Sequence, residues 1–251
     1  MIPLHDPDMR LHTKPYVIYV LVAINVLVYA YAFFLSELEG FTFVWRFGLI
    51  PFELTGGAAF ESIRVGTAQG VQLVDVASPV PTWMTIFTSM FLHGGFMHVA
   101  GNMLFLWVFG DNVENRLGRT RFIAFYLGAG VAAALAQVFV DTDSQIPMIG
   151  ASGAVAGVLG AYLVLYPRSR INTLLMLGWF IMMRRIPALW LIGFWSALQI
   201  FGGLGSLASP GGGGVAYFAH LGGLAAGLAL GGVSRARAGW HSTPRQFRPR
   251  N

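Results

Sequence analysis

Several apolar runs of about 20 residues are the feature of this sequence that most restricts its fold. A helix of about that length crosses the hydrocarbon core of a bilayer, where irregular backbone would leave its polar groups without partners. The sequence is 55% apolar and only 11% charged, whereas a soluble domain has about 25% charged residues. The short alternating strands typical of an outer-membrane barrel are absent from the pattern. We therefore predict an all-α polytopic membrane protein.

The apolar runs predict six transmembrane helices. We expect these six helices to form one membrane domain over 15–233, after a polar N-terminal tail (1–14) and before a basic C-terminal tail (234–251). The predicted spans cover about 15–35, 95–113, 122–140, 148–166, 186–204 and 215–233. In the first span Ala30-Tyr31-Ala32 is similar to a signal-peptide cleavage site, but the apolar core is too long and too aromatic for a typical signal peptide.

Three segments between the spans have distinct compositions. Residues 36–82 form a long, mostly acidic loop, in which 41–48 is too short to span and suits the membrane interface because aromatic residues flank an arginine. Residues 171–183 are apolar but number only 13 and have arginines at both ends. We expect a hairpin or interfacial segment there, since a crossing needs about 20 residues. A glycine-rich link, 205–214, precedes the last span.

The distribution of basic residues predicts the orientation of the chain. With six spans and both termini in the cytoplasm, 14 of the 16 basic residues lie inside, and only Arg46 and Arg64 lie outside. This asymmetry follows the positive-inside rule. The net charge of +5 therefore indicates topology rather than nucleic-acid binding. The sequence has no cysteine and so no disulfide, which is compatible with either side of a membrane.

Four polar side chains occupy three of the predicted spans at a common depth. His98 and Asn102, Ser152, and His220 each lie a few residues past the outer end of their span, at a depth of about 5–12 Å for a rise of 1.5 Å per residue. Polar residues in hydrocarbon are costly and tend to mark function. We therefore expect them to meet in one cavity that opens outward.

These residue types predict nucleophilic catalysis. Ser152 becomes a useful nucleophile only with a general base in hydrogen-bond reach, and His220 is the candidate base. His98, Asn102 and the Ser152 backbone N–H are candidate donors to an oxyanion. No acidic residue shares this depth, so we expect a Ser–His dyad. Glycines at helix-packing positions would let the helices approach closely enough for the dyad to form: Gly150, Gly153, Gly157, Gly223 and Gly227.

Each residue has an alternative interpretation when it is taken alone. Gly150-Ala151-Ser152-Gly153 in a membrane helix is more often a packing motif than a nucleophile. His98 could be interfacial, and His220 could relay protons. The two histidines could bind a metal, but no third ligand shares their depth. Their occurrence together favours catalysis.

Three segments resemble the signatures of the rhomboid intramembrane serine proteases, in family order on the second, fourth and sixth spans. They are His93-Gly94-Gly95-Phe96-Met97-His98-Val99-Ala100-Gly101-Asn102, Gly150-Ala151-Ser152-Gly153 and Ala219-His220-Leu221-Gly222-Gly223-Leu224-Ala225-Ala226-Gly227. The resemblance implies that Ser152 attacks a peptide bond, that His220 acts as base and then acid, and that His98 and Asn102 stabilise the oxyanion. It also implies membrane-protein substrates cleaved in or near a transmembrane segment, with no metal or other cofactor.

The sequence departs from the rhomboid pattern at two positions. Some members carry Trp-Arg before the second span, where this chain has Trp83-Met84. Many members have an aromatic residue four positions after the serine, packed on the catalytic histidine, and here that position is Ala156. We expect either a less well oriented His220 or another ring in that space. Neither departure removes a reacting group.

The sequence therefore predicts an intramembrane serine endopeptidase whose partners are transmembrane protein substrates and the lipid bilayer, without nucleic acid or metal. One alternative is a catalytically inactive rhomboid-like protein that binds membrane clients, which the loss of the aromatic at Ala156 favours. A second is a small transporter or channel, but the internal repeats or intramembrane carboxylate expected of one are missing. The absence of an Arg/Ser-rich leader favours a bacterial-type plasma membrane.

Overall fold

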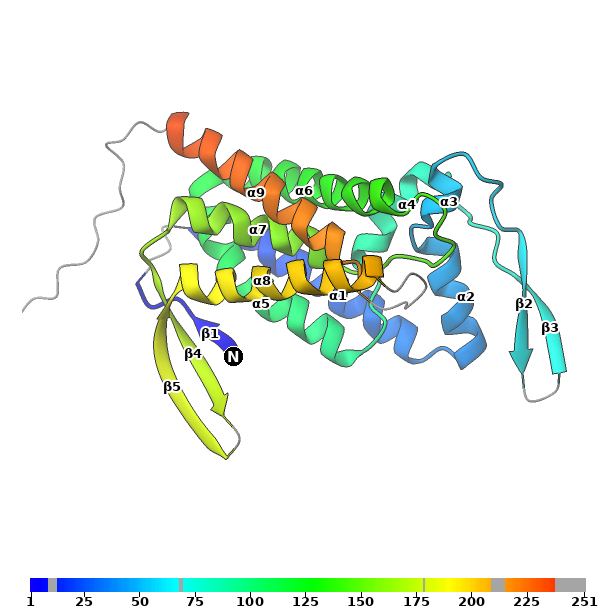
Figure 1. Cartoon of the computed structure of the whole chain (residues 1–251), viewed down its shortest axis with the longest axis horizontal. Helices are drawn as coiled ribbons and strands as arrows, with labels where there is room; N and C mark the ends of the chain where they lie inside the picture. The colour runs from blue at the N-terminus through cyan, green and yellow to red at the C-terminus, as the bar shows by residue number, and fades with distance from the viewer. Residues whose placement is uncertain (9–12, 68–69, 178, 209–214, 238–251) are drawn as a thin grey trace, which may run out of the picture.

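The computed structural model describes residues 1–8, 13–67, 70–177, 179–208 and 215–237. Six long or apolar helices lie along the length of the molecule, and small sheets lie at its two ends (Figure 1). All six predicted spans coincide with a helix. The helices are α1 (Tyr16–Phe33), α5 (Phe96–Leu117), α6 (Arg119–Val140), α7 (Ser152–Leu165), α8 (Ala188–Ala208) and α9 (Tyr217–Arg237).

The polytopic helical class is confirmed, but the helices differ in length. Within the described ranges, α1, α6, α8 and α9 are long and apolar enough to cross a membrane. Helix α5 adds a fifth span if it is joined across an 83° bend to the short helices over Thr82–Phe91. Helix α7 is apolar but has only 14 residues, so the number of full-length spans is four or five rather than six by this measure.

The late start of α7 explains its short length. The fourth span was expected from about residue 148, yet Met148 pairs with Leu49 in an isolated β-bridge. Gly150 then has a φ of +122°, a conformation that ends regular structure and that side-chain-bearing residues rarely adopt. The helix therefore begins at Ser152 itself.

Helix α7 is the centre of the bundle. Its residues from Gly153 to Tyr162 are all buried, and it packs on α9, α6 and α5. The contact with α9 is the closest, since a methyl group on Gly223 would collide with the Gly153 carbonyl oxygen and one on Gly227 with the Gly157 carbonyl oxygen. Glycine at these positions lets the two backbones touch.

The amino-terminal end of the bundle carries a three-stranded antiparallel sheet in the order β1-β4-β5. Its strands are β1 (Ile2–His5), β4 (Arg170–Leu177) and β5 (Phe180–Pro187). The hairpin expected at 171–183 is confirmed. The N-terminal tail is not simply a polar extension as expected, because Ile2, Pro3 and Leu4 belong to a strand that pairs with β4.

The opposite end, here called the loop end, holds the connection between the first two spans (Figure 1). Residues 41–48 fall within or directly after α2 (Glu37–Phe47), whose 11 residues are too few to cross a membrane. A capping box of Ser36 and Glu39 starts this helix. The remaining elements are α3 (Pro51–Leu54), β2 (Ser62–Thr67), β3 (Gly70–Asp75), η1 (Thr82–Met84), α4 (Thr85–Thr88) and η2 (Ser89–Phe91).

Two predicted segments extend beyond the described residues. The glycine-rich link was expected at 205–214, but Gly205 lies in α8, and 209–214 fall outside the described residues. Helix α9 continues to Arg237, so the described part of the predicted C-terminal tail is helical, and 238–251 lie outside the description.

Candidate active site

Ser152 and His220 lie in direct contact at the loop end of the bundle. The Ser152 Oγ and the His220 Nε2 are 2.7 Å apart, although the residues are 68 positions apart in the sequence. Ser152 is the first residue of α7, and His220 lies in the first turn of α9. The glycine contacts between these two helices, farther along each helix, bring the two side chains within hydrogen-bond reach.

The other ring nitrogen of His220 also has a partner. Gln199 of α8 places its Oε1 2.7 Å from His220 Nδ1. An amide oxygen only accepts hydrogen bonds, so Nδ1 carries the proton and Nε2 faces Ser152 with its lone pair. Trp195, one turn earlier on α8, has its ring centroid 5.7 Å from that of His220. The small Ala156 led us to expect either a less well oriented His220 or another ring beside it. The ring of Trp195 is that second case.

Gly150 has a different role from the one predicted. It was expected at a helix-packing position, but it lies in the turn before α7 with a φ of +122°. Its backbone N–H donates to the Ser89 carbonyl over 2.8 Å. A methyl group on Gly150 would lie 2.8 Å from His98 Nε2 and 3.6 Å from Ser152 Oγ. Glycine here therefore keeps open the space between the His98 ring and the serine hydroxyl.

Asn102 and His98 share one face of α5 but make different contacts. Asn102 is buried and its Nδ2 donates to His93 Nε2 over 3.0 Å. The His93 and His98 rings are 5.0 Å apart, edge to face. Thus His98 lies next to the Ser152 turn, whereas Asn102 contacts His93 instead of either member of the Ser–His pair.

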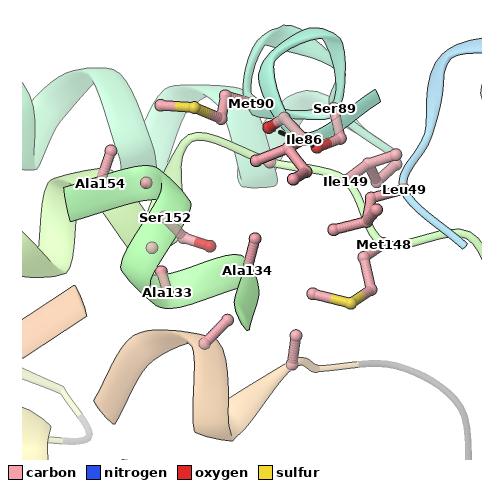
Figure 2. A pocket seen from close by; sticks show the side chains of 15 residues that line it. Leu49, Ile86, Ser89, Met90, Ala133, Ala134, Met148, Ile149, Ser152 and Ala154 are labelled. Carbon is pink, nitrogen blue, oxygen red and sulfur yellow. Dashed lines mark hydrogen bonds between the residues drawn. The ribbon is translucent and has the colours of Figure 1, made fainter. Parts of the chain in front are cut away.

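A small cavity adjoins the serine. It has a volume of about 40 Å³ and is lined mainly by apolar groups from α4, η2, α6, α7 and α9, with Ser89 and Ser152 as its polar side chains. Figure 2 shows the Ser152 hydroxyl pointing into it. A volume of about 10–15 Å³ by this measure holds one water molecule, so there is room for roughly three.

A larger cavity of about 620 Å³ lies between α1, α2 and the loops before α5 and α7. The aromatic residues Tyr29, Phe33, Phe41 and Trp45 line part of its wall, and the polar His93 and Gln145 also border it. The turn residue Ile149 lines both cavities. An apolar chain segment bound in the larger cavity would thus lie near the turn that carries Ser152.

Within the described part of the chain, no group of three or more His, Asp or Glu side chains is arranged to hold a metal ion. The hydrogen bonds of the site form two separate sets. One links Ser152, His220 and Gln199, and the other links His93 and Asn102.

The model of the rhomboid domain matches residues 80–237, which is more than half of the chain. The chain belongs to the rhomboid family. Membership makes it an integral membrane protein of helical fold, and it supports an intramembrane protease-like function.

Several curated proteins are similar to this rhomboid. The "Rhomboid protease GluP" of Bacillus subtilis is 33% identical over 150 residues, 60% of this chain and 24% of that protein. "Rhomboid protein 1, mitochondrial" of Saccharomyces cerevisiae is 34% identical over 96 residues, 37% of this chain and 28% of the relative. The "Putative rhomboid protease YdcA" of Bacillus subtilis is 33% identical over 81 residues, 32% of this chain and 40% of the relative. The matched part spans less than half the length of each relative.

Sequence reasoning missed three residues of this site in the rhomboid. His93 stood in the quoted motif, but only the later His98 and Asn102 received a role. The available signal was a second histidine, directly before Gly94-Gly95 at a span entrance. Gln199 and Trp195 had a weaker signal, namely an amide in an apolar run with an aromatic residue four positions earlier. Their partner lies on another helix, and one sequence does not show such pairings.

Proposed function

We propose that this rhomboid is a serine endopeptidase that hydrolyses peptide bonds in or near transmembrane segments of membrane proteins. The observation that supports this most directly is the 2.7 Å separation of Ser152 Oγ and His220 Nε2. A serine hydroxyl needs a base at this distance to act as a nucleophile. A serine that only packs between helices would not need a histidine at this distance, and a histidine that only relays protons would not need this serine.

The reaction follows from the protonation state of the histidine. The His220 Nε2 lone pair accepts the Ser152 hydroxyl proton while the Oγ attacks the carbonyl carbon of the substrate. The resulting imidazolium donates this proton to the leaving amine, and an acyl-enzyme remains. A water molecule, deprotonated by the same Nε2, then attacks the acyl carbonyl carbon. The imidazolium returns the proton to Ser152 Oγ as the C–O bond breaks, which releases the acid and restores the serine.

The oxyanion requires donors at the start of α7. The Ser152 backbone N–H lies in the first turn of this helix, where N–H groups have no partner inside the helix. His98, which shares the space beside Gly150 with the serine, is a second donor. We assign Asn102 a supporting role, because its amide donates to His93 and not to the Ser–His pair. The cavity beside Ser152 would supply the hydrolytic water.

The orientation and the domain limits remain part of this proposal. We place both termini in the cytoplasm and the Ser152 end outside, in a bacterial-type plasma membrane, with a six-helix domain over 15–233. Because the chain has no cysteine, single cysteines at the exposed Lys14 and Asp143 would report sidedness. An impermeant thiol reagent should label Asp143→Cys but not Lys14→Cys in intact cells, and the reverse result would exclude this orientation.

A serine-reactive fluorophosphonate tests the catalytic assignment. The wild-type protein in nanodiscs should be labelled at Ser152, and Ser152→Ala should lose all labelling. His220→Ala should react about 10²–10⁴-fold more slowly, the usual contribution of a general base. Ser206→Ala is the matched control, since that hydroxyl donates to a carbonyl of its own helix.

The same series should cleave a model transmembrane substrate in parallel with labelling. Absence of labelling and of cleavage in the correctly folded wild type would refute the peptidase and favour a rhomboid that binds membrane clients without hydrolysing them.

A further inference from the structure

We propose that Gln199 positions the general base, as the third member of a hydrogen-bonded chain from Gln199 through His220 to Ser152. The inference rests on the proposed peptidase function and extends it. Gln199 does not touch the reacting atoms. It fixes which nitrogen of His220 carries the proton and in which direction the ring faces.

The contacts of the Gln199 side chain define its orientation. Its Nε2 donates to the Trp195 carbonyl over 3.4 Å, which turns Oε1 toward α9. Oε1 lies 2.7 Å from His220 Nδ1 and must accept from it. The proton is thereby held on Nδ1, and the Nε2 lone pair is directed at the Ser152 hydroxyl 2.7 Å away. The opposite tautomer would place two acceptors against each other.

The composition of α8 indicates that this amide serves a partner outside its own helix. The polar side chains of α8 are Ser196, Gln199 and Ser206. Both serines donate to carbonyls of the same helix, those of Ile192 and Gly203. Gln199 is buried, and its oxygen instead reaches across to α9. An amide oxygen in apolar surroundings is costly unless it accepts a hydrogen bond, and the His220 N–H is the donor that the structure provides.

Trp195 supplies packing on the same histidine from the same face of α8, since residues four apart lie one above the other. Ala156, buried on α7, is too small to contact the ring in this way, and the adjacent Gly223 leaves no room between the two helices. In this rhomboid α8 therefore provides both the hydrogen bond and the ring that hold His220.

The test replaces Gln199 by side chains of similar length. Gln199→Met removes the acceptor, and we expect fluorophosphonate labelling and substrate turnover to fall about tenfold, the effect of losing one net hydrogen bond. The KM should not change, because substrate does not contact this side chain. Gln199→Glu keeps an acceptor but adds a charge that favours the imidazolium. It should retain labelling. The acidic limb of the pH–rate profile, along which the rate rises as His220 loses its proton, should shift to higher pH. Leu198→Met, at an exposed position of α8, is the matched control.

The outcomes separate this inference from the function on which it rests. If Gln199→Met and Gln199→Glu both keep the wild-type rate and pH profile while Ser152→Ala and His220→Ala are inactive, the positioning role is wrong and the peptidase stands. If the wild type itself is not labelled, both the positioning role of Gln199 and the peptidase function are refuted. Should Gln199→Met not fold, an unshifted pH profile for Gln199→Glu alone would refute the role, because a merely structural amide would leave that profile unchanged.

Discussion

The two ends of the helical bundle both contain buried hydrogen-bonded groups, but the groups differ in chemistry. At the loop end Ser152, His220 and Gln199 are linked by two 2.7 Å contacts among neutral side chains. At the amino-terminal end carboxylates are the acceptors. Asp6 accepts from the Tyr162 hydroxyl and from Asn112 Nδ2. A chain of neutral groups that includes an imidazole can move a proton, whereas a buried carboxylate surrounded by donors holds segments in place.

Glu114 shows what the amino-terminal end does for the fold. Its two carboxylate oxygens accept from the backbone N–H groups of Val17, over 3.1 Å, and Ile18, over 2.9 Å. These N–H groups belong to the first turn of α1, which follows Pro15 and has no cap from its own side chains. A carboxylate from α5 thus caps α1 and complements its dipole. The contacts at this end therefore stabilise the fold, whereas the proposed function assigns the chemistry to the loop end.

The largest effect expected from this comparison is that of Glu114→Ala. The change leaves two buried N–H groups without an acceptor, and each costs about 1–3 kcal/mol, so the free energy of unfolding should fall by roughly 4 kcal/mol. The labelling rate per folded molecule at Ser152 should stay within twofold. Glu37→Ala, an exposed position in α2, should change stability by less than about 0.5 kcal/mol. A stable Glu114→Ala protein that has lost labelling would contradict the division between the two ends.

Gly227→Val should affect both properties, because α7 and α9 join the two ends. A side chain there would collide with the Gly157 carbonyl, and overpacking of this kind costs about 1–3 kcal/mol. Separation of α9 from α7 should also move His220 away from Ser152 and slow labelling in the fraction that remains folded. Gly232→Val provides the control, since nothing lies within 4 Å of the added methyl position. Equal unfolding and labelling of the two variants would show that the close helix contact is dispensable.

The smallest expected effect concerns pH and Asp6. Burial raises the pKa of the Asp6 carboxyl above its ordinary value of 3.8, although its hydrogen bonds oppose this shift. The folded protein then binds this proton more tightly than the unfolded chain, so stability should decrease as pH rises from about 4 through the raised value. Asp6→Asn should abolish this decrease, so that its stability should change less than that of the wild type as the pH rises through the window. Thermal unfolding in nanodiscs at a series of pH values measures this dependence. Parallel curves of stability against pH for the two proteins would refute the raised pKa of Asp6.

The helical bundle and the Ser–His candidates could be predicted because their signals are local. Apolar length marks a span, and Ser152 and His220 stand out as polar residues within such runs. The start of α7 could not be predicted, because it depends on the backbone at Gly150 and on the bridge of Met148 to a distant loop. Gln199 was missed for a related reason, since its partner is 21 residues away on another helix. Strand β1 has only four residues and forms because β4 is available beside it.

The pairing of β1 with β4 also constrains the order in which the molecule can be assembled. During synthesis Ile2 leaves the ribosome well before its partner Leu174, which is made only after α1, α5, α6 and α7. Strand β1 therefore stays without its partner strand while those helices enter the bilayer. Closure of this sheet then comes as a late step of biogenesis. Asp6, directly after β1, also accepts a hydrogen bond from Tyr162, on the helix whose opposite end carries the serine.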